Sequence, residues 1–202
     1  MSDLTIDYYN SNTQNFIDGT IGADVAYLRD RFLRHVPLGG SILDLGCGSG
    51  RDTKAFFEMG YAVEAIDGSQ ELCKKATELT GCHVECKDFF EIGDEEKYDG
   101  IWACASILHV EKKRIPDLLF RLSRTLRKGG VLYVSFKYGD FSGERDGRYF
   151  VDLDEEEFCR IHTHSIDKYG CKLKIIDEWK SEDVRRGKPV KWLNEILRQI
   201  GE

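Results

Sequence analysis

The segment LDLGCGSGRD at residues 43–52 places three glycines within five positions, directly behind an apolar run. The run at residues 41–45 has the composition of a buried strand, and residues 51–59 place Ala55, Phe56 and Met59 on one face of a helix. Glycine permits backbone conformations and close approaches that a Cβ atom would hinder. The segment therefore predicts a strand, a tight turn whose backbone approaches a ligand, and a helix.

Three kinds of glycine-rich loop compete for this turn. A phosphate-cradling loop of the form G-x-x-x-x-G-K-[ST] is excluded because its lysine is missing. A dinucleotide loop of the form G-x-G-x-x-G/A fits at Gly46 and Gly48, but it places Arg51 where a third small residue is needed. Asp44, just before the turn, suits a ligand that carries an amine or a sulfonium better than it suits a pyrophosphate. The flanking charges thus favour a cationic ligand.

Apolar segments with strand character alternate with segments of helical periodicity along the middle of the chain. The predicted strands are residues 41–45, 62–66, 83–86, 98–103 and 131–136, and the predicted helices are residues 51–59, 70–79 and 115–126. Gly129 and Gly130 are expected to end the last helix and to start a strand. The alternation predicts an α/β fold with a doubly wound, mostly parallel sheet, helices on both faces, and ligand sites at the carboxyl ends of the strands.

The segments on either side of this alternation predict a cap and a lid. Residues 4–10 and 24–36 are expected to be helices, 138–150 a polar, glycine-rich loop over the strand ends, and 154–163 a helix. Residues 172–178 and 191–198 are expected to be two further strands, although the periodicity of 191–198 would also suit a short helix. We expect one domain, residues 1–202. It comprises an N-terminal helical segment (1–38), a cofactor-binding core (39–137), and a lid loop with C-terminal strands (138–202).

Composition narrows the range of partners. The chain has 202 residues, of which 41% are hydrophobic, and 29 Lys and Arg against 36 Asp and Glu give a net charge of −7. This balance argues against nucleic acid as the default partner. No apolar stretch approaches the roughly 20 residues of a membrane span, and MSDLTIDYYN lacks the basic residue and apolar core of a signal peptide. We therefore expect a soluble, cytoplasmic protein without a membrane partner.

The seven cysteines include no C-x-x-C pair. A zinc site at Cys82, His83 and Cys86 is disfavoured, because tetrahedral sites usually draw on more tightly spaced ligand pairs. We expect no metal ion and reduced thiols.

The pattern D-x-G-x-G-x-G after the first strand resembles motif I of the class I S-adenosylmethionine-dependent methyltransferases. The resemblance continues in order with Asp67 in VEAIDGS, Asp88 in CKDFF, YDGIWACASILHV, and TLRKGGVLYVSF, and it covers about residues 41–136. More narrowly, YYNSNTQNF, IWACASILHV and SFKYG with GRYF resemble a bacterial methyltransferase-domain, or tellurite-resistance-like, subgroup. The resemblance implies a Rossmann-like, seven-stranded sheet and S-adenosylmethionine as the cofactor.

The resemblance also assigns cofactor contacts. Asp67 is expected to accept both ribose hydroxyls, and Asp88 with the backbone of Phe89 to meet the adenine edge. Arg51 either reaches the cofactor's carboxylate or pairs with Asp52 or Glu58. The remaining expected contacts are Gly68, Ser69 and Leu72 at the adenosine, Asp44, Gly46, Cys47 and Gly48 at the amino-acid part, and Cys104 and Ala105 where the methyl group emerges.

The sequence defines the residues that would bind or activate the methyl acceptor less sharply than those that would bind the cofactor. His109 is the best candidate base because the free imidazole titrates near neutrality, although a packing or cofactor-shielding role competes. Tyr8 and Tyr9 either close over the cofactor or anchor the N-terminal segment. Arg145, Arg148 and Tyr149 gather basic and aromatic groups in the expected lid, which suggests an anionic acceptor, although a solvated loop explains them as well.

The predicted function is methyl transfer from S-adenosylmethionine to a small-molecule acceptor. An alternative is a catalytically silent module that binds the cofactor as a sensor or partner subunit. A nucleotide-dependent oxidoreductase is disfavoured by Arg51. A small acceptor is favoured because the chain shows no appended recognition domain, no N-P-P-[YF] tetrapeptide and no basic stripe. The acceptor atom and the oligomeric state stay open.

Overall fold

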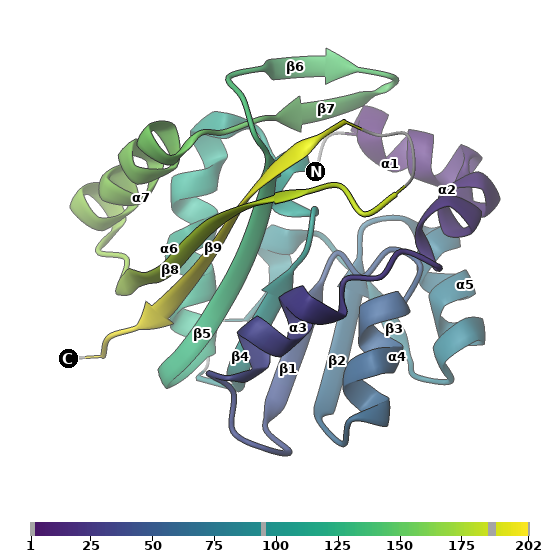
Figure 1. The fold of residues 1–202 in the computed structure, drawn as a ribbon, viewed down its shortest axis with the longest axis horizontal. Helices are drawn as coiled ribbons and strands as arrows, with labels where there is room; N and C mark the ends of the chain where they lie inside the picture. The colour runs from purple at the N-terminus through teal and green to yellow at the C-terminus, as the bar shows by residue number, and fades with distance from the viewer. Residues whose placement is uncertain (1–2, 94–95, 186–188, 202) are drawn as a thin grey trace.

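A computed structural model describes residues 3–93, 96–185 and 189–201 (Figure 1). Its main sheet has seven strands in the order β3-β2-β1-β4-β5-β9-β8. The first five strands are parallel, and β9 runs antiparallel to both β5 and β8. This confirms the predicted doubly wound, mostly parallel α/β fold.

The main-sheet strands are β1 (Ser41–Leu45), β2 (Ala62–Asp67), β3 (Val84–Cys86), β4 (Tyr98–Ala103), β5 (Leu126–Lys137), β8 (Leu173–Glu182) and β9 (Lys191–Gln199). A separate antiparallel hairpin consists of β6 (Ser142–Arg145) and β7 (Arg148–Val151). The α-helices are α1 (Asp3–Ser11), α2 (Thr13–Thr20), α3 (Ala26–Leu33), α4 (Arg51–Glu58), α5 (Gln70–Thr80), α6 (Ile115–Thr125) and α7 (Glu155–Tyr169). Short 3₁₀ turns are η1 (Phe89–Glu91), η2 (Ile107–His109) and η3 (Lys112–Arg114).

Alternate residues of the central strands pack on opposite faces of the sheet. Ile101 and Leu132 belong to a core with α6 and α7, whereas Trp102 and Tyr133 belong to a second core with α3 and α4. Trp102 and Tyr133 stack with their ring centres 4.1 Å apart. Because both faces are covered, β1 and β4 are apolar almost throughout, which is why the sequence located them residue for residue.

The structure corrects the expected loop at residues 138–150, which instead contains the β6–β7 hairpin. Asp146 and Gly147 connect the two strands, and both have positive φ, 53° and 73°. An Asp-Gly pair is the usual sequence of such a two-residue turn, so the signal was present in the chain. The hairpin lies above the carboxyl ends of the parallel strands, beside α1 (Figure 1).

Other boundaries also differ from the prediction. Helix α6 ends at Thr125, and the pair Gly129 and Gly130 lies inside β5, where the register against β4 shifts. A Cβ at Gly130 would lie 2.9 Å from the Arg127 carbonyl oxygen, so that glycine serves close packing within the sheet. Helix α7 continues to Tyr169 and ends at Gly170, and α2 was not predicted.

In the cap, α2 is an additional helix, and the two predicted helices differ only in extent. Residues 4–10 lie within α1, and α3 is shorter than residues 24–36 at both ends. Across residues 3–93, 96–185 and 189–201, no helix combines the length and apolar character that a membrane span needs.

Candidate active site

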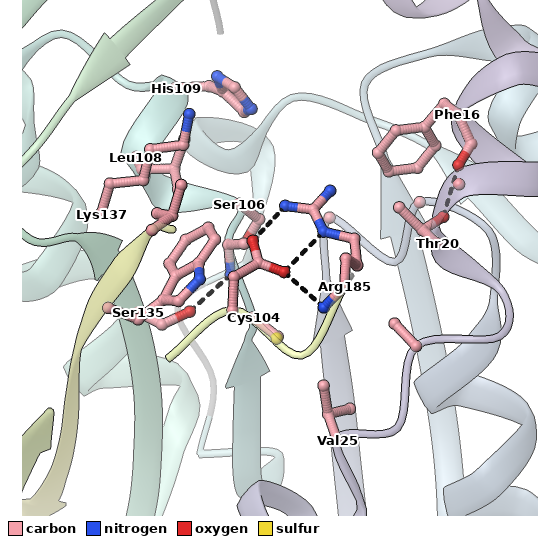
Figure 2. Close-up of a pocket in the computed structure, with 18 of the residues that line it drawn as sticks. Phe16, Thr20, Val25, Cys104, Ser106, Leu108, His109, Ser135, Lys137 and Arg185 are labelled. Atoms are coloured by element: carbon pink, nitrogen blue, oxygen red, sulfur yellow. Dashed lines mark hydrogen bonds and ion pairs between the residues drawn. The ribbon is translucent and has the colours of Figure 1, made fainter. Parts of the chain in front are cut away.

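A cleft of about 940 Å³ lies at the carboxyl ends of β1, β2, β4 and β5. Helices α1 and α2, the β6–β7 hairpin and the segment before β9 contribute to its walls. Neighbouring strands β1 and β4 lead into connections on opposite faces of the sheet, so their ends open a crevice in which α/β proteins bind ligands. Figure 2 shows part of this cleft.

The glycine loop after β1 is tightly packed. Gly46, Gly48 and Gly50 all have left-handed backbones, with φ of 76°, 57° and 77°. The backbone N–H groups of Gly46 and Cys47 both donate to the carbonyl oxygen of Ile66, at 2.9 and 3.0 Å. A Cβ at Gly46 would lie 2.5 Å from the Cβ of Ser106, so no larger residue fits without displacing the loop after β4.

Asp67 joins this loop to the end of β2. One carboxylate oxygen accepts the N–H of Gly48 and the other accepts the N–H of Ser69, each at 2.9 Å. Burial raises the pKa of Asp67, although these backbone hydrogen bonds oppose the shift. Ser69 in turn caps α5 by accepting the N–H of Leu72, as its position before that helix suggests.

Asp44 and Thr53 form a second buried polar contact under the loop. The Thr53 hydroxyl donates to the Asp44 carboxylate at 2.6 Å. Burial, followed by the nearby Asp52, raises the pKa of Asp44 to about 7. A cation bound beside it would favour the ionised form.

Asp52 forms a buried ion cluster that the sequence only partly indicated. Arg51 donates to both of its carboxylate oxygens, at 3.1 and 2.6 Å. Arg29 of α3 and the Trp102 indole donate to the same carboxylate, at 2.6 and 3.0 Å. Burial raises the pKa of Asp52, but the two guanidinium groups outweigh it and hold that pKa below its usual value. Of the alternatives for Arg51, the pair with Asp52 is present, and the contact with the cofactor's carboxylate stays a prediction.

The chain turns sharply at the end of β4. Ala105 has φ of 53°, which costs a non-glycine residue about 1 kcal/mol or more. Its N–H donates to the Ser135 hydroxyl of β5 at 2.8 Å, which holds this conformation. The turn places Cys104 and Ser106 at the cleft, and the buried Ser106 hydroxyl has no hydrogen-bond partner in the described part of the chain.

Both ring nitrogens of His109 are engaged. Nδ1 lies 2.7 Å from the carbonyl oxygen of Tyr149 and must donate to it, so the neutral ring leaves Nε2 to accept the Tyr9 hydroxyl at 2.9 Å. Burial lowers the pKa of His109 to about 3, and the positive charges of Arg148 and Lys137 add to the effect. This geometry favours the packing role over that of a base.

Helix α1 spans both walls of the cleft. On one side Asn10 accepts a hydrogen bond from the Ser69 hydroxyl at 2.7 Å. On the other side the Thr5 hydroxyl accepts the backbone N–H of Tyr149 at 3.0 Å, and the Arg148 guanidinium lies 4.3 Å from the Tyr8 ring centre. Tyr8 and Tyr9 therefore lie at the junction of α1 and the hairpin, as a closing segment would.

The cleft brings together most of the residues that the sequence singled out. Those lining it are Tyr8, Tyr9, Asp44, Gly46, Cys47, Gly48, Arg51, Asp67, Leu72, Phe89, Cys104, Ala105, His109, Arg145 and Arg148. Gly68, Ser69, Asp88 and Tyr149 are outside its lining. Asp88 begins η1, where its carboxylate accepts the N–H of Phe90 at 2.9 Å.

Several lining residues were not predicted as site residues. Asp52, Ser106, Lys137, Arg185 and Trp192 all border the cleft. Lys137 could have been found, because it ends β5 at the same edge of the sheet as the other strand ends. Arg185 and Trp192 follow no motif, and only the fold brings their segment to the cleft.

Across the described residues, no three His, Cys, Asp or Glu side chains gather as a metal site would require.

Comparisons with known proteins agree with this geometry. Residues 42–130 match a family described as a methyltransferase domain. A protein named as an uncharacterized methyltransferase, from Staphylococcus carnosus (strain TM300), is 25% identical over 184 residues, which cover 81% of this chain and 89% of that protein. The domain match confirms the methyltransferase prediction.

Solved structures share the fold at low sequence identity. The 1,6-didemethyltoxoflavin-N1-methyltransferase of Burkholderia thailandensis, solved with 1,6-didemethyltoxoflavin and S-adenosylhomocysteine, superposes with a TM-score of 0.71 at 20% identity, covering 96% of this chain and 90% of that chain. The [4+2]-cyclase SpnF superposes with a TM-score of 0.73 at 14% identity, covering 96% and 94%. These matches confirm the Rossmann-like fold of the class I methyltransferases.

The packing of the glycine loop can be tested with two matched glycines. Gly46→Ala and Gly60→Ala both place a Cβ on a left-handed backbone, but at Gly60 no atom lies within 4 Å of it. We expect Gly60→Ala to cost about 1 kcal/mol and Gly46→Ala about 3 kcal/mol of unfolding free energy, because only Gly46 adds a steric overlap. Urea unfolding measures both, and equal losses would show that the loop has room for a Cβ.

The state of His109 predicts a pH dependence of stability. Its pKa is depressed in the folded protein, so the unfolded chain binds an extra proton below about pH 6.5 and stability is lost as the pH falls. Between pH 7 and pH 5, His109 should account for a loss of about 2 kcal/mol. The His109→Gln variant should lack this part of the loss in urea unfolding at both pH values. Substituting the exposed His83 with Gln is the control, and an unchanged slope in His109→Gln would refute the assignment.

Proposed function

We propose that this chain binds S-adenosylmethionine in the cleft and transfers its methyl group to a small-molecule acceptor. The observation that carries the proposal is the buried Asp67 carboxylate, which ends β2 and is hydrogen-bonded to the glycine loop that follows β1. The domain match at residues 42–130 supports the same reaction class. The narrower tellurite-resistance-like subgroup stays a prediction from the sequence.

The chemistry of the cleft fits this cofactor. Of the buried carboxylates around the glycine loop, Asp52 is neutralised by Arg29 and Arg51, whereas Asp44 and Asp67 form no ion pair within the described residues. A ligand with an ammonium and a sulfonium would be favoured beside these two carboxylates. A pyrophosphate would be repelled at the same place. The left-handed glycines leave the loop without Cβ atoms at its turns, so its backbone can approach a ligand closely.

Specific residues would hold each part of the cofactor. The two oxygens of the Asp67 carboxylate accept the backbone N–H groups of Gly48 and Ser69, with a further backbone contact from Gly68. A carboxylate offers about four lone-pair sites, so acceptor capacity remains for a ribose hydroxyl. Leu72 and Phe89 would flank the adenosine. The other predicted contacts that line the cleft belong to the amino-acid end or to the methyl end of the cofactor. We assign Gly46, Cys47, Gly48 and Asp44 to the amino-acid end, and Cys104 and Ala105 to the methyl end. Contacts from Gly68, Ser69 and Asp88 stay predictions.

The cofactor supplies an electrophilic methyl group on a cationic sulfur. The protein's residues then have to align the acceptor with that methyl group and exclude water. Helix α1 and the β6–β7 hairpin enclose the cleft through the Tyr9–His109 and Thr5–Tyr149 hydrogen bonds. His109, neutral and buried, would shield the site; a role as base would first require Tyr9 to release Nε2.

The size and enclosure of the cleft support a small acceptor. The Burkholderia thailandensis enzyme that shares this fold is named for a small-molecule acceptor, 1,6-didemethyltoxoflavin. Arg148 favours an anionic acceptor here, whereas Arg145 is engaged with Asp152 and the Tyr149 side chain is outside the cleft lining. The fold alone does not fix the reaction, because SpnF, with the same fold, is named a cyclase. A silent cofactor-binding module therefore stays the alternative.

Ligand affinity tests the cofactor assignment. Calorimetry should show binding of S-adenosylhomocysteine and not of NAD. Asp67→Asn should weaken the binding of S-adenosylhomocysteine about 10- to 100-fold, because the amide has one acceptor oxygen where the carboxylate has two and its NH2 group only donates. Asp99→Asn is the matched control: Asp99 also accepts a backbone N–H, that of Ser41 at 2.8 Å, but at the opposite edge of the sheet. Binding of NAD alone would overturn the proposal. Full affinity in Asp67→Asn would remove the ribose assignment.

Turnover is tested separately with the same protein. A screen of small molecules with methyl-labelled cofactor should transfer label to at least one acceptor. Binding of S-adenosylhomocysteine without any transfer, across acceptors of every charge, would favour the silent module.

A further inference from the structure

The lid end of the cleft concentrates positive charge in a chain whose net charge is −7. Four half-buried basic side chains line it: Lys137 from the end of β5, Arg145 and Arg148 from the hairpin, and Arg185 from the segment before β9. The lining also includes three exposed residues, the basic Lys191 and the acidic Asp146 and Glu182. Lys137 is close enough to all three arginines that each of them disfavours its charged form. The opposite end, at the glycine loop, is acidic. The two ends of one cleft therefore differ in sign.

Two of these four cations are neutralised within the protein. Arg145 donates to both carboxylate oxygens of Asp152, at 3.0 and 2.9 Å. Arg185 forms a similar pair with Asp183, which includes a bond of 2.9 Å from its Nε (Figure 2). In contrast, neither Lys137 nor Arg148 forms an ion pair with any carboxylate of the described residues. Two positive charges are thus left over at this end.

Lys137 and Arg148 converge on the same aromatic ring. The Lys137 ammonium lies 4.0 Å and the Arg148 guanidinium 5.0 Å from the centre of Phe150. In Figure 2 the Lys137 amine points toward His109, away from the strand that carries it. Nε of Arg148 is buried without a hydrogen-bond partner, and its Nη1 reaches only the Tyr9 hydroxyl, at 3.5 Å. Each group therefore has donors that the protein does not use.

Holding these charges together is unfavourable without a counter-ion. Burial, followed by the guanidinium of Arg145, lowers the pKa of Lys137 to about 8, although the nearby Asp152 carboxylate opposes the shift. Like charges at this separation in a partly buried site repel each other, and an anion between them would reverse the sign of the interaction. The unpartnered Ser106 hydroxyl at the same cleft offers a further donor.

We propose that Lys137 and Arg148 form a subsite that binds a carboxylate or phosphate group of the methyl acceptor. The inference rests on the proposed function and deepens it by naming the substrate class and a residue, Lys137, that the motifs did not indicate. The guanidinium binds such groups through paired N–H donors, and the ammonium adds a compact point charge. The acidic end of the cleft remains for the cationic cofactor.

Binding of small anions to the protein saturated with S-adenosylhomocysteine tests the subsite. The probes are benzoate, phenyl phosphate and uncharged benzamide, titrated and followed by NMR. We expect one of the two anions to bind and benzamide not to bind, and the stronger anion distinguishes a carboxylate from a phosphate. Absence of binding by both anions, or equal binding of benzamide, would overturn the proposal.

Variants then assign the binding to the two side chains. Lys137→Gln and Arg148→Gln should each lower the affinity for the anion about tenfold or more. Lys137→Arg, which keeps the positive charge, should retain most of the affinity that Lys137→Gln loses. Arg145→Gln should have a smaller effect because Asp152 already neutralises Arg145. Lys174→Gln, an exposed lysine on β8, is the control for loss of one positive charge. Unchanged anion affinity in both Lys137→Gln and Arg148→Gln would refute the subsite.

The affinity for S-adenosylhomocysteine separates this inference from the proposed function. It should stay within about twofold of the parent in Lys137→Gln and Arg148→Gln. A parallel loss of S-adenosylhomocysteine affinity in these variants would assign the two cations to the cofactor's carboxylate and overturn the subsite while leaving the cofactor in place. If Lys137→Gln does not fold, Arg148→Gln and Lys137→Arg carry the test.

Discussion

The buried carboxylate of Asp52 is the contact on which the floor of the cleft depends. It accepts hydrogen bonds from Arg29 of α3, from Arg51 at the start of α4, and from the Trp102 indole of β4. Removing it would leave two guanidinium groups in a largely buried place without a counter-charge, which costs several kcal/mol. The helix that follows the glycine loop is therefore fixed to the sheet at its first turn. That constraint holds the loop where Asp67 can bind it.

Charge is distributed along the cleft in a way that explains how two different ligands could share it. Carboxylates surround the glycine loop at one end of the cleft. At the other end, beside the β6–β7 hairpin, cationic side chains lie around the ring of Phe150. Within each group the protein pairs some charges internally, as in Arg51 with Asp52 and Arg145 with Asp152. The charges left unpaired have opposite signs at the two ends. A cationic donor and an anionic acceptor would thus be drawn to different places in one cavity.

The parallel part of the fold could be predicted because its strands are buried on both faces. Residues 41–45 and 98–103 were located without error, since strands covered on both sides consist of nearly continuous apolar residues. The hairpin at the lid was predicted as a loop, because its strands have only four residues each and β6 is polar and half exposed. The Asp146-Gly147 pair, which is typical of a hairpin turn, was interpreted only as part of that loop. The prediction that Gly129 and Gly130 end a helix was wrong. Inside β5, Gly130 meets a packing need and Gly129 has a left-handed backbone with φ of 82°, whereas the pair was expected to mark the end of a helix.

The candidate site shows the same division between local and long-range information. Gly46, Gly48 and Asp67 follow strands directly, so the sequence places them at one edge of the sheet. Apart from the adjacent Arg51, the partners of Asp52 and His109 are 23 to 100 residues away in the chain, in two helices, a strand and a hairpin that no motif connects to them. Tyr9 and His109 illustrate the consequence: each was singled out separately, but only the fold shows that one hydroxyl occupies the imidazole nitrogen that a base would need. Helix α1 also bonds Ser69 beside Asp67, so the segment that closes the lid contacts the cofactor end as well. Freeing His109 therefore requires a change at Tyr9, on a helix that touches both ends of the cleft.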